Sequence, residues 1–192
     1  LLDGIDGFAG LYATLLSFFM VLSGYVLEVF YLQIIGLATI GVLSPFLYYN
    51  MFHRRKLFMG DSGSMVLGLL TAFYALSFVH EVQSTPSELS HPYSWLLALT
   101  ALPLLDLLRV IMIRWSQGRP IFSPDKNHIH HAYLNMGLSH NQTTFIVMEL
   151  TLSFWLFVFW FEFLTQGWHI LVVALLMLGI YLGPILFYKL KQ

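Results

Sequence analysis

The sequence predicts an all-α, polytopic membrane protein with about six transmembrane helices. The chain of 192 residues is 58% hydrophobic and only 10% charged, whereas a soluble domain carries roughly 25% charged residues. Its mean hydropathy is +0.74, and its apolar runs are long enough to cross a bilayer, which takes about 20 residues. A soluble helical bundle would show polar helix faces, which these runs lack.

Six apolar runs account for most of the chain. Short turns around residues 28–33, 84–87 and 166–167 separate neighbouring runs. The segment 115–143 is the one long polar loop. We interpret residues 1–192 as part of a single integral-membrane domain with these runs as its transmembrane helices. The predicted spans are residues 8–30, 31–52, 62–80, 92–114, 144–164 and 167–187.

The basic residues predict the orientation of these spans. If the six spans alternate, all nine Lys and Arg side chains fall on one side of the membrane, and the other side carries glutamates without any Lys or Arg. Because cytoplasmic loops are enriched in Lys and Arg, we expect the basic side to be cytoplasmic. The N-terminal segment and the long loop lie on this side as well. The nine residues are Arg54, Arg55, Lys56, Arg109, Arg114, Arg119, Lys126, Lys189 and Lys191.

The cysteine count and the first residues limit the interpretation further. The chain has no cysteine, which excludes disulfides and Cys-based zinc sites. It begins with Leu1, and no signal-peptide pattern precedes its first acidic residues. We therefore expect residues 1–192 to be the C-terminal part of a longer polypeptide.

The turn between the second and third runs carries the first candidate site. A basic triplet at residues 54–56 ends one run, and Asp61 lies in a Gly-Asp-Ser-Gly sequence just before the next. Glycines let a turn tighten and a ligand approach backbone N–H groups, and anions are stabilised where such groups start a helix. The triplet, the acid and the helix start therefore indicate a site for a metal–phosphate ligand. A plain surface turn is the alternative.

Two further acids stand at the start of the chain. Asp3 and Asp6 are three residues apart, which puts both carboxylates on one face of a helix. Such a pair repels unless a cation or a proton lies between them. Together with Asp61 they would supply the hard oxygen ligands that Mg²⁺ prefers. A solvated helix start, where acids are favoured, is the alternative.

Asp106 is an ionisable residue inside the fourth run. Burying a charge there costs on the order of 3 kcal/mol, so its carboxylate should face the protein interior or a wet cavity and have a partner. Arg109, three residues further on, is the nearest candidate. A structural ion pair and a role in the site both stay open.

The long loop carries the most specific pattern, His-Ile-His-His at residues 128–131. Ser123 and Pro124 predict a helix start, and Gly137 predicts its end. This helix would hold three imidazoles at the membrane surface above the acids, which favours a functional role over a structural one. A His-ligated transition metal is a rival, but no clear carboxylate or Cys partner completes such a site.

Three ordered motifs resemble those of a known family. They are Asp3-Gly4-Ile5-Asp6-Gly7-Phe8-Ala9, then Phe58-Met59-Gly60-Asp61-Ser62-Gly63-Ser64 with Leu67-Gly68, then His128-Ile129-His130-His131. The chain thus resembles the polyprenyl-phosphate N-acetylhexosamine-1-phosphate transferases of glycosyltransferase family 4, the group of MraY, WecA and TagO. The likeness runs from residue 1 to about residue 143. The form of the His motif, preceded by Asp125-Lys126-Asn127, looks more like the WecA/TagO branch.

The resemblance implies a reaction. Undecaprenyl phosphate attacks the sugar-bearing phosphorus of a UDP-N-acetylhexosamine, UDP-N-acetylglucosamine in this branch; UMP leaves, and a lipid-diphosphate sugar forms for cell-envelope glycans. The resemblance also implies Mg²⁺, with Mn²⁺ as an alternative, and a site on the cytoplasmic face of the bacterial inner membrane. Its partners would be these two substrates and membrane lipid, with a homodimer as a possible assembly and no nucleic acid.

The resemblance also assigns roles to individual residues. Asp61 and Asp6 would bind the metal. The catalytic positions would be Asp3, Asp6, Asp61, His128, His130 and His131, and the substrate-binding positions would be Asn50, Gly60, Ser62 and Arg119.

Two alternative functions stay open. An MraY-type enzyme would use the muramyl-pentapeptide precursor as its donor. A transporter would need charges near the membrane midplane and paired broken helices, whereas most charges here gather at one surface. The chain also lacks the family's upstream aspartate-rich motif and the asparagines before Asp-Gly-x-Asp-Gly, so we predict that residues 1–192 alone are inactive.

Overall fold

The chain is helical throughout its regular structure. A computed structural model describes residues 4–85, 91–121 and 128–190, with side chains up to residue 179. No strand occurs within these ranges, which confirms the all-α prediction. The elements are α1 (Phe8–Val26), α2 (Phe30–Leu47), the π-helical turn η1 (Tyr48–Phe52), α3 (Gly60–Ser84), α4 (Pro92–Ser116), α5 (Ile129–Leu134), α6 (His140–Trp160) and α7 (Gln166–Leu190).

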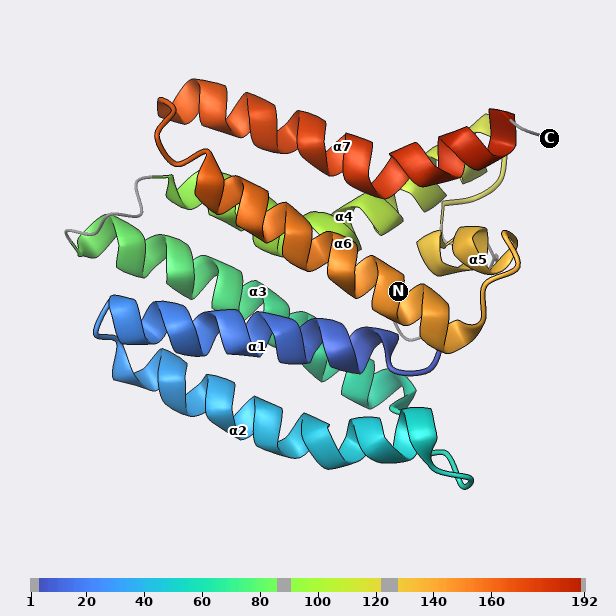
Figure 1. The fold of residues 1–192 in the computed structure, drawn as a ribbon, viewed down its shortest axis with the longest axis horizontal. Helices are drawn as coiled ribbons and strands as arrows, with labels where there is room; N and C mark the ends of the chain where they lie inside the picture. The colour runs from blue at the N-terminus through green and yellow to red at the C-terminus, as the bar shows by residue number, and fades with distance from the viewer. Residues whose placement is uncertain (1–3, 86–90, 122–127, 191–192) are drawn as a thin grey trace.

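The long helices lie side by side in one bundle and alternate in direction (Figure 1). α1 packs against α2, α3 and α6, and α4 packs against α3, α6 and α7. The short helix α5 lies at one end of the bundle, against the start of α6. The loops between successive long helices therefore alternate between the two ends of the bundle, and every second loop lies at the end where α5 is.

Five helices are long and apolar enough to cross a membrane: α1, α2 with η1, α3, α4 and α6. This identifies a multi-pass membrane protein. The described apolar part of α7, Gln166–Gly179, is shorter than the others, so the sixth span stays a prediction.

Local chemistry sets the helix ends, which differ from the ends of the apolar runs. α1 stops at Val26, before the predicted residue 30, and Glu28 then takes a φ of 58° as the chain reverses. α6 begins at His140 rather than 144 because a capping box starts it. The Gln142 N–H donates to Ser139 Oγ over 3.3 Å, and the Ser139 N–H donates to Gln142 Oε1 over 2.9 Å. Each bond satisfies a backbone donor that a helix start leaves open.

The core lies where α1 crosses α3, α4 and α6. Buried side chains of α1 recur every four residues, which places them on one helix face. Trp155 of α6 is also buried, and its indole N–H donates to the Ala98 carbonyl over 3.1 Å. Four large residues of this face, all buried, are Phe8, Tyr12, Leu16 and Met20.

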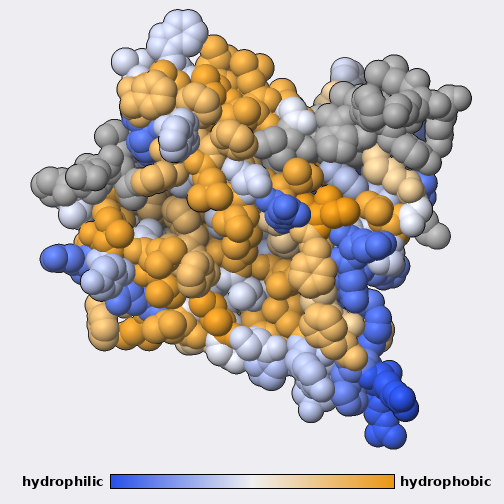
Figure 2. Space-filling model, in the orientation of Figure 1, coloured by the Kyte–Doolittle hydropathy of each residue, from blue (hydrophilic) through white to orange (hydrophobic). Residues whose placement is uncertain are grey.

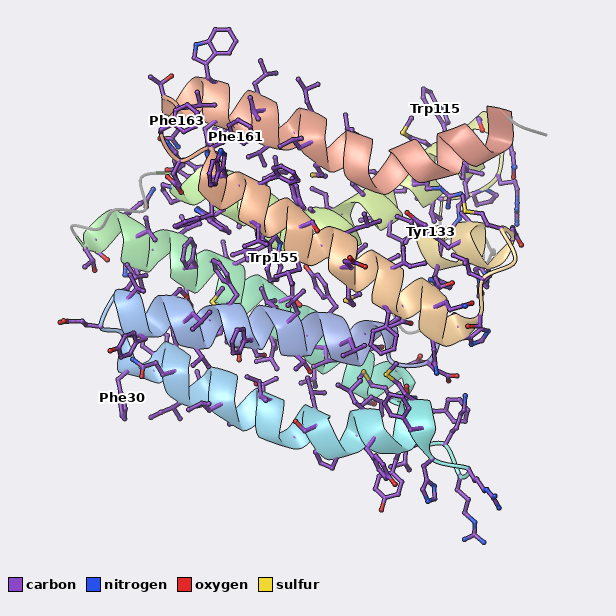
Figure 3. The ribbon with its side chains drawn as sticks, viewed as in Figure 1. Phe30, Trp115, Tyr133, Trp155, Phe161 and Phe163 are labelled. Atoms are coloured by element: carbon purple, nitrogen blue, oxygen red, sulfur yellow. The ribbon has the colours of Figure 1, made fainter. Side chains whose placement is uncertain are left out.

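The outer surface is apolar along the helices and hydrophilic towards the ends (Figure 2). Large apolar side chains such as Val42, Leu69 and Leu175 are exposed there, as expected for helix faces that meet lipid. Aromatic side chains mark both ends in Figure 3: Phe30, Phe161 and Phe163 at one end, Trp115 and Tyr133 at the other. Aromatic residues favour the two membrane–water interfaces, so the membrane normal follows the long axis of the bundle.

Candidate active site

The predicted site residues gather at one end of the bundle. The N-terminal segment, the turn before α3, the last turns of α4, α5 and the start of α6 all lie there (Figure 1). We call it the basic end, after Lys56, Arg114 and Arg119. The opposite end, formed by the turns after α1, α3 and α6, carries Glu28, Glu81 and Glu162 and is called the acidic end. This agrees with the partition of charge in the sequence.

Asn50 connects the first two motifs. Its Oδ1 accepts a hydrogen bond from the Gly7 N–H over 2.5 Å, and its Nδ2 donates to the Leu57 carbonyl over 2.6 Å. Asn50 belongs to η1, and its side chain is buried. Because one amide binds both segments, residues 4–7 and the turn before α3 are held in a fixed relation. Asn50 therefore fixes the relative position of two segments of the site.

Asp6 lines a small cavity. Its carboxylate forms an ion pair with Lys56, and His140 Nδ1 is 3.7 Å from Asp6 Oδ2. The Asp6 backbone carbonyl accepts from Thr144 Oγ1 over 2.8 Å, which ties the segment to α6. The cavity has a volume of about 160 Å³ and is lined by Gly4, Ile5, Asp6, Asn50, Phe58 and His140.

Asp61 stands in the first turn of α3 and is exposed. Gly60 takes a φ of 68°, a left-handed conformation that a side chain would disfavour, and so lets the chain turn into the helix. Ser62 is exposed beside it. Among the described residues, no side chain pairs with the Asp61 carboxylate. An unpaired carboxylate at a helix start is available to a cation.

Asp106 anchors the His-containing loop. The carboxylate is fully buried in α4, and its Oδ2 lies 2.8 Å from His128 Nδ1. Its Oδ1 accepts from the Ile129 N–H over 2.6 Å. The sequence pointed to Arg109 as the partner, and the structure corrects this: both oxygens face the loop. The pair holds the start of α5 against α4.

His130 is buried between the N-terminal segment and its neighbouring histidines. Its ring is parallel to that of His128 at a centroid distance of 5.6 Å and lies 4.4 Å from that of His131. Gly4 packs so closely that an added Cβ would come within 2.2 Å of His130 Nε2. Burial, and then the nearby His131, lowers the pKa of His130 to about 4. The ring is therefore neutral near pH 7, and neither of its nitrogens has a hydrogen-bond partner in the described part of the chain.

The other residues that the sequence assigned to the site are Arg119, Asp3, Ser123 and Pro124. Arg119 is exposed just after α4, with its backbone N–H donating to the Arg114 carbonyl over 2.9 Å. Asp3 lies outside the described residues, as do Ser123 and Pro124, the predicted helix start. α5 itself begins at Ile129, with His128 as its N-cap. Within the described ranges, no three His, Asp or Glu side chains converge as a ready metal site.

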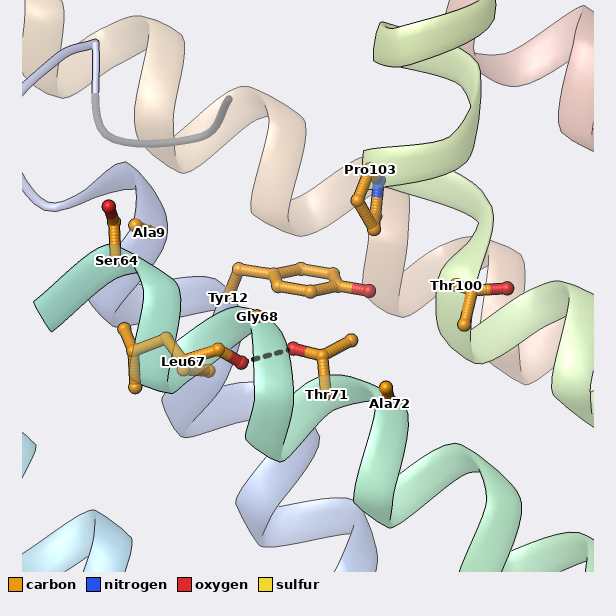
Figure 4. Close-up of a pocket in the computed structure, with 10 residues that line it drawn as sticks. Ala9, Tyr12, Ser64, Leu67, Gly68, Thr71, Ala72, Thr100 and Pro103 are labelled. Carbon is orange, nitrogen blue, oxygen red and sulfur yellow. Dashed lines mark hydrogen bonds between the residues drawn. The ribbon is translucent and has the colours of Figure 1, made fainter. Parts of the chain in front are cut away.

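An apolar slot opens between α1, α3 and α4, with a volume of about 280 Å³ (Figure 4). Tyr12 extends across it and donates its hydroxyl to the Leu99 carbonyl. Ser64, three residues after Asp61, lines one part of the slot, and Pro103 of α4 lines another. The slot therefore connects the start of α3 with the apolar interior. Its small side chains, which leave the space open, are Ala9, Ala13, Gly68 and Ala72.

The sequence interpretation did not identify three residues that contribute to the site. His140 and Thr144 approach Asp6 from α6, and Phe58 lines the same cavity. His140 follows the Ser139 cap signal on the basic side of the chain, which could have identified it. Nothing in the spacing of the sequence indicated that Thr144 would meet Asp6.

Comparison with known proteins gives the family. The model of "Glycosyl transferase family 4" matches residues 1–79, which contain the first two motifs. The chain belongs to this family. The resemblance inferred from the three motifs is thereby confirmed.

Relatives in the family carry closely related names. The chain is 38% identical over 120 residues to "Decaprenyl-phosphate N-acetylglucosaminephosphotransferase" of Mycobacterium tuberculosis (strain CDC 1551 / Oshkosh), covering 59% of this chain and 30% of the relative. It is 35% identical over 151 residues to "Probable undecaprenyl-phosphate N-acetylglucosaminyl 1-phosphate transferase" of Bacillus subtilis (strain 168), covering 77% and 39%.

A third relative is "Undecaprenyl-phosphate alpha-N-acetylglucosaminyl 1-phosphate transferase" of Escherichia coli (strain K12), 32% identical over 118 residues, with 59% of this chain and 30% of the relative covered. The matches thus span between 30% and 39% of the length of these three relatives. No solved structure matches the chain significantly.

Proposed function

We propose that the protein containing this chain transfers N-acetylglucosamine 1-phosphate from a UDP-sugar to a polyprenyl phosphate and releases UMP. The observation that supports this most is the meeting of three family motifs at one membrane end. Asp6, Asp61 and the histidines at 128–131 come from separate parts of the sequence and lie at the basic end. The names of the relatives support the same substrates.

The donor would occupy the polar surface of the basic end. Transfer of a phosphoryl group depends mainly on positioning and on neutralising charge, and this end offers cations beside the Asp6 cavity. This cavity, with His140 at its wall and Lys56 paired to Asp6, is a place for the nucleotide part. Arg119 and His131 would hold the diphosphate or the sugar.

Asp61 fits a role in binding Mg²⁺. Mg²⁺ is bound in such sites by one or two carboxylates together with substrate phosphates and water, so a complete protein cage is not needed. The Asp61 carboxylate is exposed and has no partner among the described side chains. Asp6, the second proposed ligand, is held by Lys56 and would have to exchange this partner for the metal. When bound, the ion would neutralise the diphosphate.

The acceptor would place its lipid chain in the apolar slot between α1, α3 and α4. The slot begins beside Ser64, close in sequence to Asp61, and leads into the hydrophobic part of the bundle. An isoprenoid entering here would carry its phosphate towards the start of α3. We place the site on the cytoplasmic face of the bacterial inner membrane, because the basic end has the charge typical of that side.

The test uses the complete polypeptide in membrane vesicles. Radiolabelled UDP-N-acetylglucosamine, undecaprenyl phosphate and Mg²⁺ are supplied, and label is counted in the organic phase. We expect label with the wild type and a loss of at least about 1,000-fold with Asp61→Asn, because the metal loses its charged ligand. Glu81→Gln is the matched control, since it makes the same chemical change at the acidic end, where Glu81 accepts from Tyr31.

Other outcomes would correct the proposal. Label only with a muramyl-pentapeptide donor would keep the reaction and change the branch to the MraY type. No label with any donor, from protein shown to be inserted, would refute the transferase function and favour a transporter.

A further inference from the structure

The three basic residues of the turn before α3 differ in their partners. Lys56 pairs with Asp6 in the candidate site. Arg54 and Arg55 are exposed, and no carboxylate of the described residues pairs with either guanidinium. The proposed reaction thus gives no role to these two adjacent arginines. The turn that carries them forms the strongly hydrophilic projection at the lower right of Figure 2.

The turn that carries these arginines is held by local contacts. The His53 ring lies 4.9 Å from that of Tyr49, whose ring in turn contacts Tyr48 edge-on at 5.4 Å. The Arg55 N–H donates to His53 Nδ1 over 3.1 Å. The backbone at Arg55 is therefore held by the histidine, and the two exposed arginines stand on this turn.

The position of the turn matches the depth of lipid headgroups. The span formed by α2 and η1 ends at Phe52, and the arginines follow within three residues. Tyr48 and Phe52 are exposed on the last turn of that span. Aromatic side chains favour the interface, and basic side chains just beyond a span attract anionic lipid. The guanidinium group suits phosphate because its N–H donors bind two oxygens together.

We propose that Arg54 and Arg55, backed by Tyr48, Tyr49 and His53, form a binding site for the phosphate headgroup of an anionic phospholipid in the surrounding leaflet. The site is separate from the transfer chemistry, since Lys56 and not these arginines forms the ion pair with Asp6, and no reacting group is assigned to Arg54 or Arg55. It would anchor the turn that carries Lys56 and precedes Asp61, and so keep that turn at a constant depth.

The experiment measures lipid retention directly. The complete protein in detergent is mixed with equal amounts of phosphatidylglycerol and phosphatidylcholine, and bound lipids are counted by native mass spectrometry. We expect the wild type to prefer phosphatidylglycerol and Arg54→Gln/Arg55→Gln to lose about tenfold or more of that preference. Arg54→Lys/Arg55→Lys keeps the charge without the paired donors and should fall between the two.

The control is Arg114→Gln, which removes a cation at the same end whose guanidinium is already bound to the Ile121 carbonyl. It should retain the wild-type preference. Adding inorganic phosphate or UDP distinguishes the sources of phosphate: neither should displace the lipid. An equal preference in the wild type and the double Gln variant would overturn the proposal. So would displacement of the lipid by UDP, because the arginines would then belong to the donor site.

Discussion

The two ends of the bundle use the same residue types in different ways. At the acidic end, His91 Nε2 lies 3.0 Å from the Glu162 carbonyl, Trp95 Nε1 donates to Glu162 Oε1 over 2.7 Å, and the His91 and His169 rings are 4.4 Å apart. At the basic end, Asp61 has no partner among the described side chains, and neither nitrogen of His130 has a hydrogen bond within the described residues, whereas His91 and His169 lack one only at Nδ1.

This difference separates a structural role from a reactive one. At the acidic end, Glu162, His91 and His169 join α4 to the turn between α6 and α7 and to α7, and Glu81 joins α3 to α2 through Tyr31. The acidic groups and histidines of the basic end are positioned by Asn50 and Asp106 but keep donor and acceptor capacity for a ligand. We therefore expect changes at the basic end to affect transfer, and changes at the acidic end to affect stability alone.

After Asp61→Asn, the largest effect is expected for Asp106→Ala. This change removes both acceptors of the loop and leaves the Ile129 N–H and His128 without their partners. We expect transfer to fall on the order of 100-fold, because displaced catalytic groups cost that much. The free energy of unfolding should fall by about 3 kcal/mol. Transfer rates in vesicles and thermal unfolding in detergent measure the two effects.

The matched variant Asp106→Asn keeps one oxygen for the Ile129 N–H, but it loses the charge and replaces the oxygen that faces His128 with an NH2 donor. It should be less damaging than Asp106→Ala in both assays. A wild-type transfer rate in Asp106→Ala would show that the loop need not be anchored for activity.

The next effect concerns pH. The pKa of His130 is about 4 in the folded protein and about 6.5 in the unfolded chain. Only the unfolded state binds the proton between these values, so stability is complete above pH 6.5 and falls as the pH drops towards 4. The loss amounts to about 3 kcal/mol, with little further change below pH 4.

Apparent Tm values of the wild type and His130→Gln between pH 7 and pH 4 measure this effect. The wild-type Tm should fall more steeply with acid, so that the two curves converge. Parallel curves would show that His130 is not the titrating group.

A smaller effect is expected at the acidic end. Glu162→Ala leaves the Trp95 indole N–H without its acceptor, which should cost about 1–2 kcal/mol of unfolding free energy. Transfer should stay within about twofold of the wild type, since a change remote from the site leaves transition-state binding intact. A selective loss of transfer without a loss of stability would contradict the division between the two ends.

The smallest effect is expected for Ser139→Ala at the start of α6. The capping box would lose its hydroxyl acceptor, at a cost of about 1 kcal/mol. Thermal unfolding measures the loss. A drop in transfer beyond this small destabilisation would show that the cap also positions His140 beside Asp6.

The sequence predicted five of the six spans because these depend on composition over about 20 residues; the sixth span and the cytoplasmic orientation, inferred from the charges in the loops, stay predictions. It also predicted that Asp61 and the histidines would meet at one end. It could not predict which side chains would pair. The partner of Asp106 was expected three residues away in α4, yet it comes from a loop 22 residues further on. Such pairings depend on how the helices rotate against one another, which an apolar run does not encode.

The triplet at residues 54–56 shows the same limit. Three cations in a row indicated one phosphate site, but the turn sends Lys56 towards Asp6 and leaves two arginines exposed. The contact of His53 with the Arg55 backbone fixes this turn, which the row of charges does not reveal. The charges in the sequence locate such a cluster, but they do not show which side chain enters the site and which ones stay exposed.

The hydrogen bond between Asn50 and Gly7 joins positions 43 residues apart. The Gly7 amide proton can exchange with solvent only when Asn50 releases it, so its exchange rate follows the opening of the whole junction between the two motifs. That single proton is a built-in reporter: a ligand that bridges both motifs would slow its exchange, whereas a ligand that touches one of them would leave the rate nearly unchanged.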